Sequence, residues 1–317
     1  MAGDALIREL READAAAVAR LQVAVNPHQV VTPRAIWYRA TREIEGERRR
    51  DWVAELDGAI VGCAHAGFEW YLPAPGKGRF WVGVHPKLRK RGLGSELYAT
   101  ASDYLRAEGA SRLRTWVDGD PDGERFVRER GFEPRGTDRV SAVDPRDVDV
   151  SELPRLEARG FRAVHLAEVR HRILELFEIC AAGERDMPTD EPEAELDLES
   201  WKRDEFWLPD LSDEGSFVAL AGERPVSLAF LRVDPERRLA YNQMTATLPE
   251  YRRRGLALLV KLAAARWAAE AGIERLLTEN DTENVSMLAI NERLGYRLLY
   301  EQRSWVLEGV GPPCERG

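Results

Sequence analysis

Cysteine and histidine are scarce in this chain, which has three cysteines and five histidines among 317 residues. Cys63, Cys180 and Cys314 are scattered and odd in number, so their spacing predicts neither a disulfide framework nor a zinc site. The histidines are isolated and give no metal-ligand spacing. These absences argue against metal chemistry and against a disulfide-rich secreted protein, and they favour a reducing, cytoplasmic environment.

Positive charge and long apolar runs are also in short supply. The 46 lysines and arginines are outnumbered by 55 acids, for a net charge of −9, which argues against general affinity for nucleic acid or an anionic membrane. The first residues carry acids where a signal peptide would be apolar. The most apolar long stretch, 256–269, is interrupted by Lys261 and Arg266, so it predicts a helix of a soluble protein and no membrane span.

The sequence does contain one motif that occurs twice. The segment 84–94, VHPKLRKRGLG, recurs as 247–257, TLPEYRRRGLA, with an offset of 163 positions between Arg89 and Arg252. Each copy ends a strand-like run and begins an amphipathic helical pattern. Matching copies in the two halves indicate duplication of one structural unit.

The order of predicted elements repeats in the same way. In the first half, hairpin strands 51–56 and 60–68 are followed by strand 79–85, helix 92–108, strand 111–117 and a short helix over 123–130. In the second half, strands 216–221 and 225–233 are followed by strand 239–247, helix 255–271, strand 275–279 and helix 283–294. We therefore expect domains at 1–145 and 160–317, joined by a linker at 146–159 that is rich in Asp, Pro and Arg.

The repeated turn combines features that suit the binding of a phosphate group. The first four N–H groups of a helix lack partners within the helix, and the helix dipole adds partial positive charge there. Gly92 and Gly255 have no Cβ, so the backbone can approach a phosphate closely, and the adjacent arginines and lysine add cations. A solvated basic turn is the structural alternative, but it does not account for two copies in register.

At this point the sequence resembles the GNAT superfamily of acyl-CoA-dependent N-acetyltransferases. The family motif, Arg/Gln-x-x-Gly-x-Gly/Ala, stands here at 89–94 and at 252–257. A second family motif is matched by Asn284 followed by Leu294-Gly295-Tyr296. The layout is similar to that of two-domain members such as mycothiol synthase. The resemblance implies an α+β fold in two tandem domains, each with a mixed, mostly antiparallel central sheet flanked by helices.

The resemblance also implies the cofactor, acetyl-CoA, and the residues that bind it. The turn amides would bind the pyrophosphate, and strand backbone would pair with the pantetheine arm. Carried over by position, the cofactor-binding residues of the second half are Thr245, Ala246, Thr247, Arg252, Arg253, Arg254, Gly255, Leu256, Ala257, Asn280 and Asn284, where helix capping is the alternative role for the two asparagines. Those of the first half are Val82, Gly83, Val84, Arg89, Lys90, Arg91, Gly92, Leu93 and Gly94.

The two halves are not equivalent at the sequence level. Where the second half has Asn284, the same count back from the first half's stop glycine gives Asp120. We therefore expect catalysis in the second half and a degenerate first half. The family's tyrosine acid is replaced by Asn291 and by Val127. Glu279 and Tyr241 are the remaining catalytic candidates, with a solvated strand end and a half-buried sheet tyrosine as their structural alternatives.

The segment 184–214 should cover the acceptor site, and it combines 13 acids with Met187, Trp201, Phe206 and Trp207. Acids beside aromatics suit a cationic amine, although a solvated loop is the alternative. The leading hypothesis is an N-acetyltransferase that acts on the primary amine of a small molecule, as a monomer with internal pseudo-symmetry or a homodimer. The alternative is a non-catalytic acyl-CoA-binding or sensing protein. Walker and dinucleotide-binding glycine patterns are missing.

Overall fold

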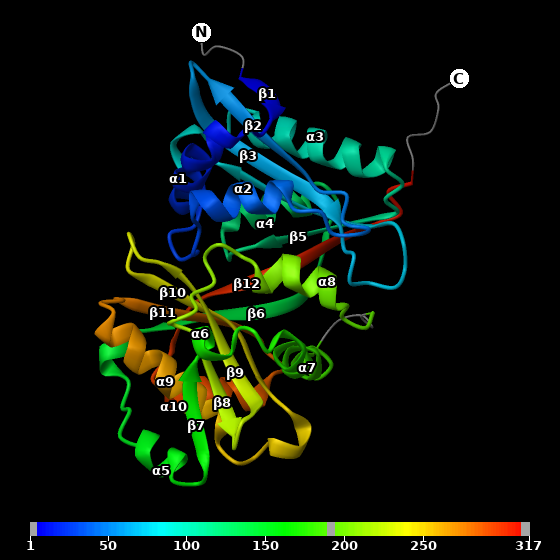
Figure 1. Ribbon diagram of the computed structural model, residues 1–317. Coiled ribbons are helices and arrows are strands. Elements are labelled where there is room, and N and C mark those ends of the chain that lie inside the picture. Colours follow the sequence, from blue (N-terminus) through cyan, green and yellow to red (C-terminus); the bar gives the residue numbers. More distant parts are fainter. Residues whose placement is uncertain (1–4, 189–193, 312–317) are drawn as a thin grey trace. The chain divides into compact units, whose positions relative to one another are not determined.

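The computed structural model describes residues 5–188 and 194–311. Its contacts divide the chain into two compact units, and neither is contiguous in sequence. Unit 1 comprises Met1–Thr137, Asp190–Ala194 and Gln302–Gly317, and unit 2 comprises Asp138–Thr189 and Glu195–Glu301. Figure 1 labels the elements along the chain.

Unit 1 is built on a sheet in which the strands follow the order β1, β2, β3, β4, β5 and then the end of β12. All neighbours pair antiparallel except β4 and β5, which are parallel. The strands are β1 Leu6–Glu9, β2 Arg50–Leu56, β3 Ala59–Phe68, β4 Lys77–Val84, β5 Arg112–Val117 and β12 Arg297–Glu308. The helices are η1 Glu12–Asp14, α1 Ala15–Val25, α2 Pro33–Thr41, η2 Pro86–Leu88, α3 Leu93–Ala107 and α4 Pro121–Arg128.

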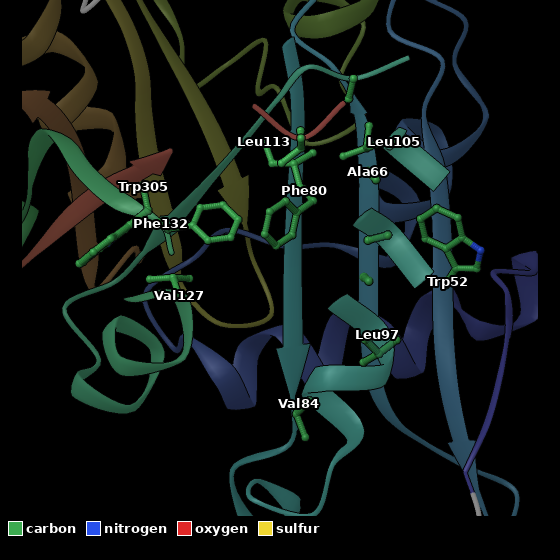
Figure 2. Close-up of a cluster of buried hydrophobic side chains, with 14 of the residues drawn as sticks. Trp52, Ala66, Phe80, Val84, Leu97, Leu105, Leu113, Val127, Phe132 and Trp305 are labelled. Atoms are coloured by element: carbon green, nitrogen blue, oxygen red, sulfur yellow. The ribbon is translucent and has the colours of Figure 1, made fainter. Parts of the chain in front are cut away.

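Strand alternation gives this sheet two buried faces. Trp52 and Ala54 of β2 pack into a cluster with Leu97 and Leu105 of α3, while Val53, between them, packs with α1 and α2 on the other face. Figure 2 shows the α3 side of this core. Because successive strand residues point to opposite faces, an uninterrupted apolar run is needed where both faces are covered.

Unit 2 repeats the plan with the strand order β7, β8, β9, β10, β11 and then the end of β6. Here β10 and β11 are the parallel pair. The strands are β6 Glu133–Val143, β7 Phe161–His165, β8 Phe217–Ala221, β9 Arg224–Asp234, β10 Leu239–Thr247 and β11 Arg275–Asp281. The helices are η3 Pro145–Asp147, α5 Leu153–Glu157, α6 Leu166–Val169, α7 Ile173–Glu184, α8 Leu198–Trp201, the π-helical turn η4 Lys202–Phe206, η5 Pro249–Tyr251, α9 Leu256–Glu270 and α10 Val285–Arg293.

Each sheet receives its last strand from the other half of the sequence. Residues 138–143 of β6 pair with β11, and residues 303–308 of β12 pair with β5. An open strand edge exposes unpaired backbone groups, and this exchange covers the outer edge of β5 and of β11. The expected contiguous domains, 1–145 and 160–317, stay a prediction; the compact units cross both of those boundaries.

The fold class predicted from the sequence is confirmed, with mixed and mostly antiparallel sheets flanked by helices. The segment expected as a linker is more structured than its composition indicated. It contains η3 and α5, and α5 packs against α9. Within residues 5–188 and 194–311, no helix is long and apolar enough to cross a membrane.

Candidate functional site

The site of unit 2 begins where β10 and β11 separate. The two strands pair in parallel only over Leu239–Asn242 and Arg275–Thr278. Beyond that point β10 continues beside β9 and β11 continues beside β6. The pairing of β10 with β9 shifts between Asn242 and Met244, which places Gln243 in a β-bulge at the point of separation. The strands therefore form an open wedge, and a bulge at its base redirects the neighbouring side chains.

The basic turn lies at the end of β10. Arg253 has φ 58° and Gly255 has φ 84°, so the chain reverses through two left-handed residues before α9 begins. Gly255 is the N-cap, where a side-chain cap is lacking, which leaves the first amides of α9 for another partner. The positive φ favours glycine at this position, and a Cβ on Gly255 would lie 2.9 Å from Leu156 Cδ2 of α5, so the end of that side chain would have to shift.

The three arginines of this turn play different parts. Arg252 Nε donates to the carbonyl of Thr247 at 3.0 Å, and its guanidinium forms an ion pair with Asp186. Arg254 donates to the carbonyl of Glu250, while Arg253 is exposed. Arg159, which sequence reasoning missed, donates to the carbonyl of Arg254 at 3.1 Å. Arg252 thus braces the turn, and the others add positive charge near the N-terminus of α9.

Unit 1 reproduces this turn in its backbone. Lys90 has φ 62° and Gly92 has φ 92°, and Arg89 Nε donates to the carbonyl of Val84 at 3.3 Å. The strands β4 and β5 also separate, because they pair only over Lys77–Arg79 and Arg112–Arg114. The duplication inferred from the sequence is therefore present in three dimensions at the predicted residues.

The charges around the turn of unit 1 differ from those of unit 2. Asp120 forms an ion pair with Arg89 at 2.7 Å, and Asp122 forms one with Lys90 at 3.0 Å. The hydrogen bond from Lys90 is the main cause that lowers the pKa of Asp122. Two carboxylates from the start of α4 thus pair with two of the turn's three cations, and they would repel an incoming phosphate.

The asparagines of unit 2 have structural partners. Asn284 is the N-cap of α10, and its Oδ1 accepts from the amide of Met287 at 3.2 Å, which is the capping role weighed as the alternative. Asn280 Oδ1 accepts from Asn291 Nδ2 at 2.6 Å. Asn291 is 4% exposed, and its own Oδ1 is buried without a hydrogen-bond partner. A buried amide oxygen of this kind can accept an N–H group from a ligand.

Glu279 and Tyr241, the two catalytic candidates, are brought together. Tyr241 is placed opposite Leu277 in the parallel ladder, two residues before Glu279. The pKa of Tyr241 is raised far above its ordinary value, mainly by burial and next by the nearby charge of Glu279. Tyr241 is therefore a protonated hydroxyl at neutral pH, able to donate a hydrogen bond. Their catalytic roles stay predictions.

Glu205 is a residue that sequence reasoning counted among the acids of segment 184–214 without singling it out. It lies on the π-helical turn η4, a type of irregularity that is frequent at functional sites. Its Oε2 is buried without a hydrogen-bond partner. Burial raises the pKa of Glu205 far above its ordinary value, with Glu184 and Asp204 adding to the effect, while the nearby donor Gln243 opposes it. The carboxyl group thus adjoins the bulge residue of β10.

The other acids of this segment divide into several groups. Asp210 forms an ion pair with Arg232 at 2.7 Å, and Asp186 and Asp213 pair with Arg252 and Arg170. These pairs reduce the negative charge that the composition implied. Asp190, Glu191 and Glu193 lie outside the described residues. Of the four apolar residues, Trp201 and Phe206 are core residues, whereas Trp207 and Met187 are exposed.

Comparison with known proteins gives one family. The model of the acetyltransferase (GNAT) family matches the chain twice, at residues 9–132 and 175–296. Each match contains one wedge and one basic turn.

Curated relatives and solved structures agree with this match. The chain is 31% identical over 78 residues to an acetyltransferase of Sodalis glossinidius and 34% identical over 70 residues to one of Yersinia enterocolitica. These alignments use 25% and 22% of the chain and span about half of each relative, 52% and 47%.

Two solved structures match almost the whole chain. A tandem GNAT protein from the clavulanic acid biosynthesis pathway has a TM-score of 0.73 at 18% identity, over 98% of this chain and 100% of that one. A GCN5-related N-acetyltransferase from Sphaerobacter thermophilus has a TM-score of 0.66 at 15% identity, over 98% and 97%. At these identities the likeness shows the fold.

Proposed function

The chain belongs to the acetyltransferase (GNAT) family, and from this premise we propose that it is an acetyl-CoA-dependent N-acetyltransferase whose working site is in unit 2. The observation that carries the proposal is the combination of an open β10–β11 wedge with a basic turn on an uncapped helix. Helix N-termini with free amides and nearby arginines are suited to phosphate.

We assign residues of unit 2 to successive parts of this coenzyme. The amides at Gly255, Leu256 and Ala257 would bind the diphosphate, assisted by Arg253 and Arg254. The edge of β10 from Thr245 to Thr247, which β11 has left, would pair with the pantetheine arm. The buried Oδ1 of Asn291 is an acceptor for one of the arm's amides. Bound acetyl-CoA supplies the activated acetyl group.

We propose a small amine as the acceptor, bound in cationic form near Glu205. The Glu205 carboxyl group adjoins the bulge residue Gln243, and Glu184 contributes further negative charge. Tyr241 and Glu279 lie near each other on the same two strands that form the wedge. Because an ammonium group cannot attack a thioester, the acceptor must lose a proton. Burial favours the neutral form of Glu205, and the positive charge of a bound amine favours the ionised form, which is the form that can take this proton.

The direct test is turnover. Purified protein is incubated with acetyl-CoA and a panel of small amines, and thiol release is followed with a colour reagent. Amine-dependent release is expected, and Glu205→Gln should lower kcat/KM for the amine by about 100-fold or more, the lower end of the range for a general base. Glu199→Gln is the matched control, because Glu199 lies in the same segment but is exposed and pairs with Lys202. Equal effects of both variants would contradict the assignment of Glu205.

A non-catalytic acyl-CoA-binding protein is the second candidate. It is favoured by Asn291, because an amide at the family's tyrosine position can donate a hydrogen bond but is not an acid that transfers its proton to the leaving thiolate. Stoichiometric binding of acetyl-CoA in calorimetry, with thiol release no faster than in buffer for every amine of the panel, would establish this candidate instead.

A further inference from the structure

Lys261 of α9 is a buried lysine for which the fold gives no structural reason. It is 3% exposed, and its Nζ donates to Asn242 Oδ1 at 2.7 Å. Nζ also lies 5.4 Å from the centroid of the Tyr296 ring. Burying a lysine without an opposite charge is costly, so this position should have a purpose beyond packing.

The position of Lys261 is at the base of the wedge. Asn242 is the last residue of β10 that pairs with β11, and it precedes the bulge. Its side chain is fixed from three directions, since Nδ2 donates to the carbonyl of Met244 at 2.9 Å while Oδ1 accepts from Thr245 Oγ1 and from Lys261. The ammonium group is therefore held against the strand just where the two strands part.

Unit 1 shows that the fold does not require a polar group here. The turn arginines Arg89 and Arg252 match Lys261 to Tyr98 and, with the bulge allowed for, Asn242 to Phe80. The glycines that follow α4 and α10 match Tyr296 to Phe132. The counterparts in unit 1 are thus Tyr98, Phe80 and Phe132. These three are an aromatic cluster with ring centroids 5.4 to 6.2 Å apart. Phe80 and Phe132 are visible in Figure 2. Unit 1 also lacks the bulge, since the ladder of β3 and β4 runs without interruption over the described residues.

Burial lowers the pKa of Lys261 from 10.5 to about 7. Desolvation is the cause, and Tyr296 is the titratable side chain in contact with the ammonium group. The charges of Glu279 on β11 and Arg232 on β9 act on Tyr241 instead, which precedes Asn242 on β10. On α9 itself, Arg266 and Glu270 lie more than one turn away, and Arg266 is exposed. A lysine in this condition can both give and take a proton near neutral pH.

We propose that Lys261 is the acid that protonates the coenzyme's thiolate as it leaves, in place of the tyrosine that this chain lacks. This inference rests on the proposed function. The acceptor nitrogen forms a bond to the acetyl carbon, the carbon–sulfur bond breaks, and its electron pair stays on sulfur. The sulfur takes a proton from Lys261 Nζ, leaving a neutral amine that regains its proton from solvent. The acceptor, bound as an ammonium ion, loses two protons in becoming the amide: one goes to the ionised carboxylate of Glu205 and the other to water.

The test uses binding as well as turnover. Calorimetry at pH 8 compares CoA with desulfo-CoA, in which hydrogen replaces the thiol, on the wild type and on Lys261→Met. An opposite charge close by shifts a pKa by one to three units, and part of this coupling is spent on ionising both groups at pH 8, so the wild type should prefer CoA by up to about 10-fold. Lys261→Met should bind both compounds with equal affinity. Tyr98→Phe is the matched control in unit 1 and should behave as the wild type.

Turnover gives a second readout. With Lys261→Met, kcat should fall by about 100-fold, a typical contribution of general acid catalysis, with little change in KM for acetyl-CoA. The wild-type kcat should decline as pH rises through the pKa of Lys261, because the acid form is lost, and this alkaline decline should vanish in the variant. An unchanged decline together with an unchanged preference for CoA would overturn the proposal.

A measurement on the wild type covers the case in which the variant does not fold. Lysine labelled with carbon-13 at Cε is titrated by NMR, and the pKa of Lys261 should rise when CoA binds but not when desulfo-CoA binds. Equal pKa values with both compounds would overturn the role of Lys261 while leaving the proposed function in place. Failure of the wild type to bind CoA at all would instead overturn the proposed function.

Discussion

The two units carry the same turn in different electrostatic surroundings. Both reverse through a left-handed basic residue and a left-handed glycine, and in both the first arginine braces the turn on the carbonyl that ends the strand. In unit 1 Arg89 and Lys90 of this turn are paired with two carboxylates from the start of the next helix, Asp120 and Asp122. In unit 2 the next helix begins with Asn284, a neutral cap.

The comparison extends to the strand before the turn. β10 contains a bulge and a buried Lys261–Asn242 hydrogen bond, whereas the matched part of β4 is a regular strand packed with aromatic rings. An apolar cluster is the cheaper arrangement for a core, because it leaves no polar group to satisfy. The shared backbone of the turn reflects the duplication of one structural unit. Unit 2, which we propose as the working unit, differs from unit 1 in the bulge and the buried polar pair, which are less favourable for packing.

The largest expected effect is on CoA affinity, when a negative charge is placed at the N-terminus of α9 and, for comparison, of α3. Ala257→Glu places a carboxylate in the first turn of α9, where helices accept acids well but a phosphate would be repelled. We expect CoA affinity to fall roughly 100-fold, equivalent to about 2.7 kcal/mol. Gly94→Glu is the matched change in unit 1, where a Cβ finds only ordinary contacts at 3.7 Å. Calorimetry should show an unchanged affinity for it, and a loss of binding in this variant would assign the site to unit 1.

The next effect concerns stability and its dependence on pH. The folded state holds the pKa of Lys261 at about 7, against 10.5 for an ordinary lysine. Between these values the unfolded chain binds the extra proton, so the stability of unit 2 should rise with pH across this window and be lowest below pH 7. Lys261→Met should melt higher at pH 6 and lose this rise, and thermal melts at several pH values measure both. Tyr98→Phe, its counterpart in unit 1, should keep the wild-type pH dependence, and a variant curve parallel to that of the wild type would contradict the assignment.

Sequence reasoning located the turns, the strands before them and the fold class, because these depend on local patterns such as glycine placement and hydrophobic periodicity. It did not foresee that β6 and β12 would complete the sheets of opposite halves. Tertiary packing decides which distant strand a given strand pairs with. The hydrophobic pattern of the strand itself is the same whichever sheet it joins.

The sequence predicted some residues of the candidate site and missed others, again because local patterns do not specify long-range contacts. Carrying over the motif gave Gly255 and its neighbours, but the motif carries no information on what faces them, so the ion pairs of Asp120 and Asp122 appeared only in the structure. In the sequence Lys261 is a charge within the most apolar helix, and by itself it argues only against a membrane span. Its meaning depends on Asn242, which is 19 positions away.

A smaller effect is expected from restoring the charge of the turn in unit 1. Asp120→Asn combined with Asp122→Asn leaves Arg89 and Lys90 without their carboxylate partners, while an asparagine can still cap α4. A second CoA site should then appear with a Kd about 10 to 100 times that of unit 2, because the bulge and Asn291 have no counterpart there. Calorimetry at high CoA concentration counts the sites. A stoichiometry that stays at one would show that the turn of unit 1 has lost more than its charge.

The smallest expected effect concerns Asp186, a carboxylate that pairs with the turn of unit 2. Asp186 pairs with Arg252 in unit 2, but its side chain is 53% exposed and it comes from the segment after α7, not from the helix that faces the turn. An exposed ion pair contributes about 0 to 1 kcal/mol, so a phosphate can compete with it. Asp186→Asn should therefore tighten CoA binding by about two- to threefold at low salt, and the gain should shrink at 0.5 M salt, where surface charges are screened. Weaker binding in this variant would instead mean that Asp186 holds Arg252 in the position that phosphate needs, and Asp213→Asn, which removes a comparable pair with Arg170 away from the turn, controls for general charge effects.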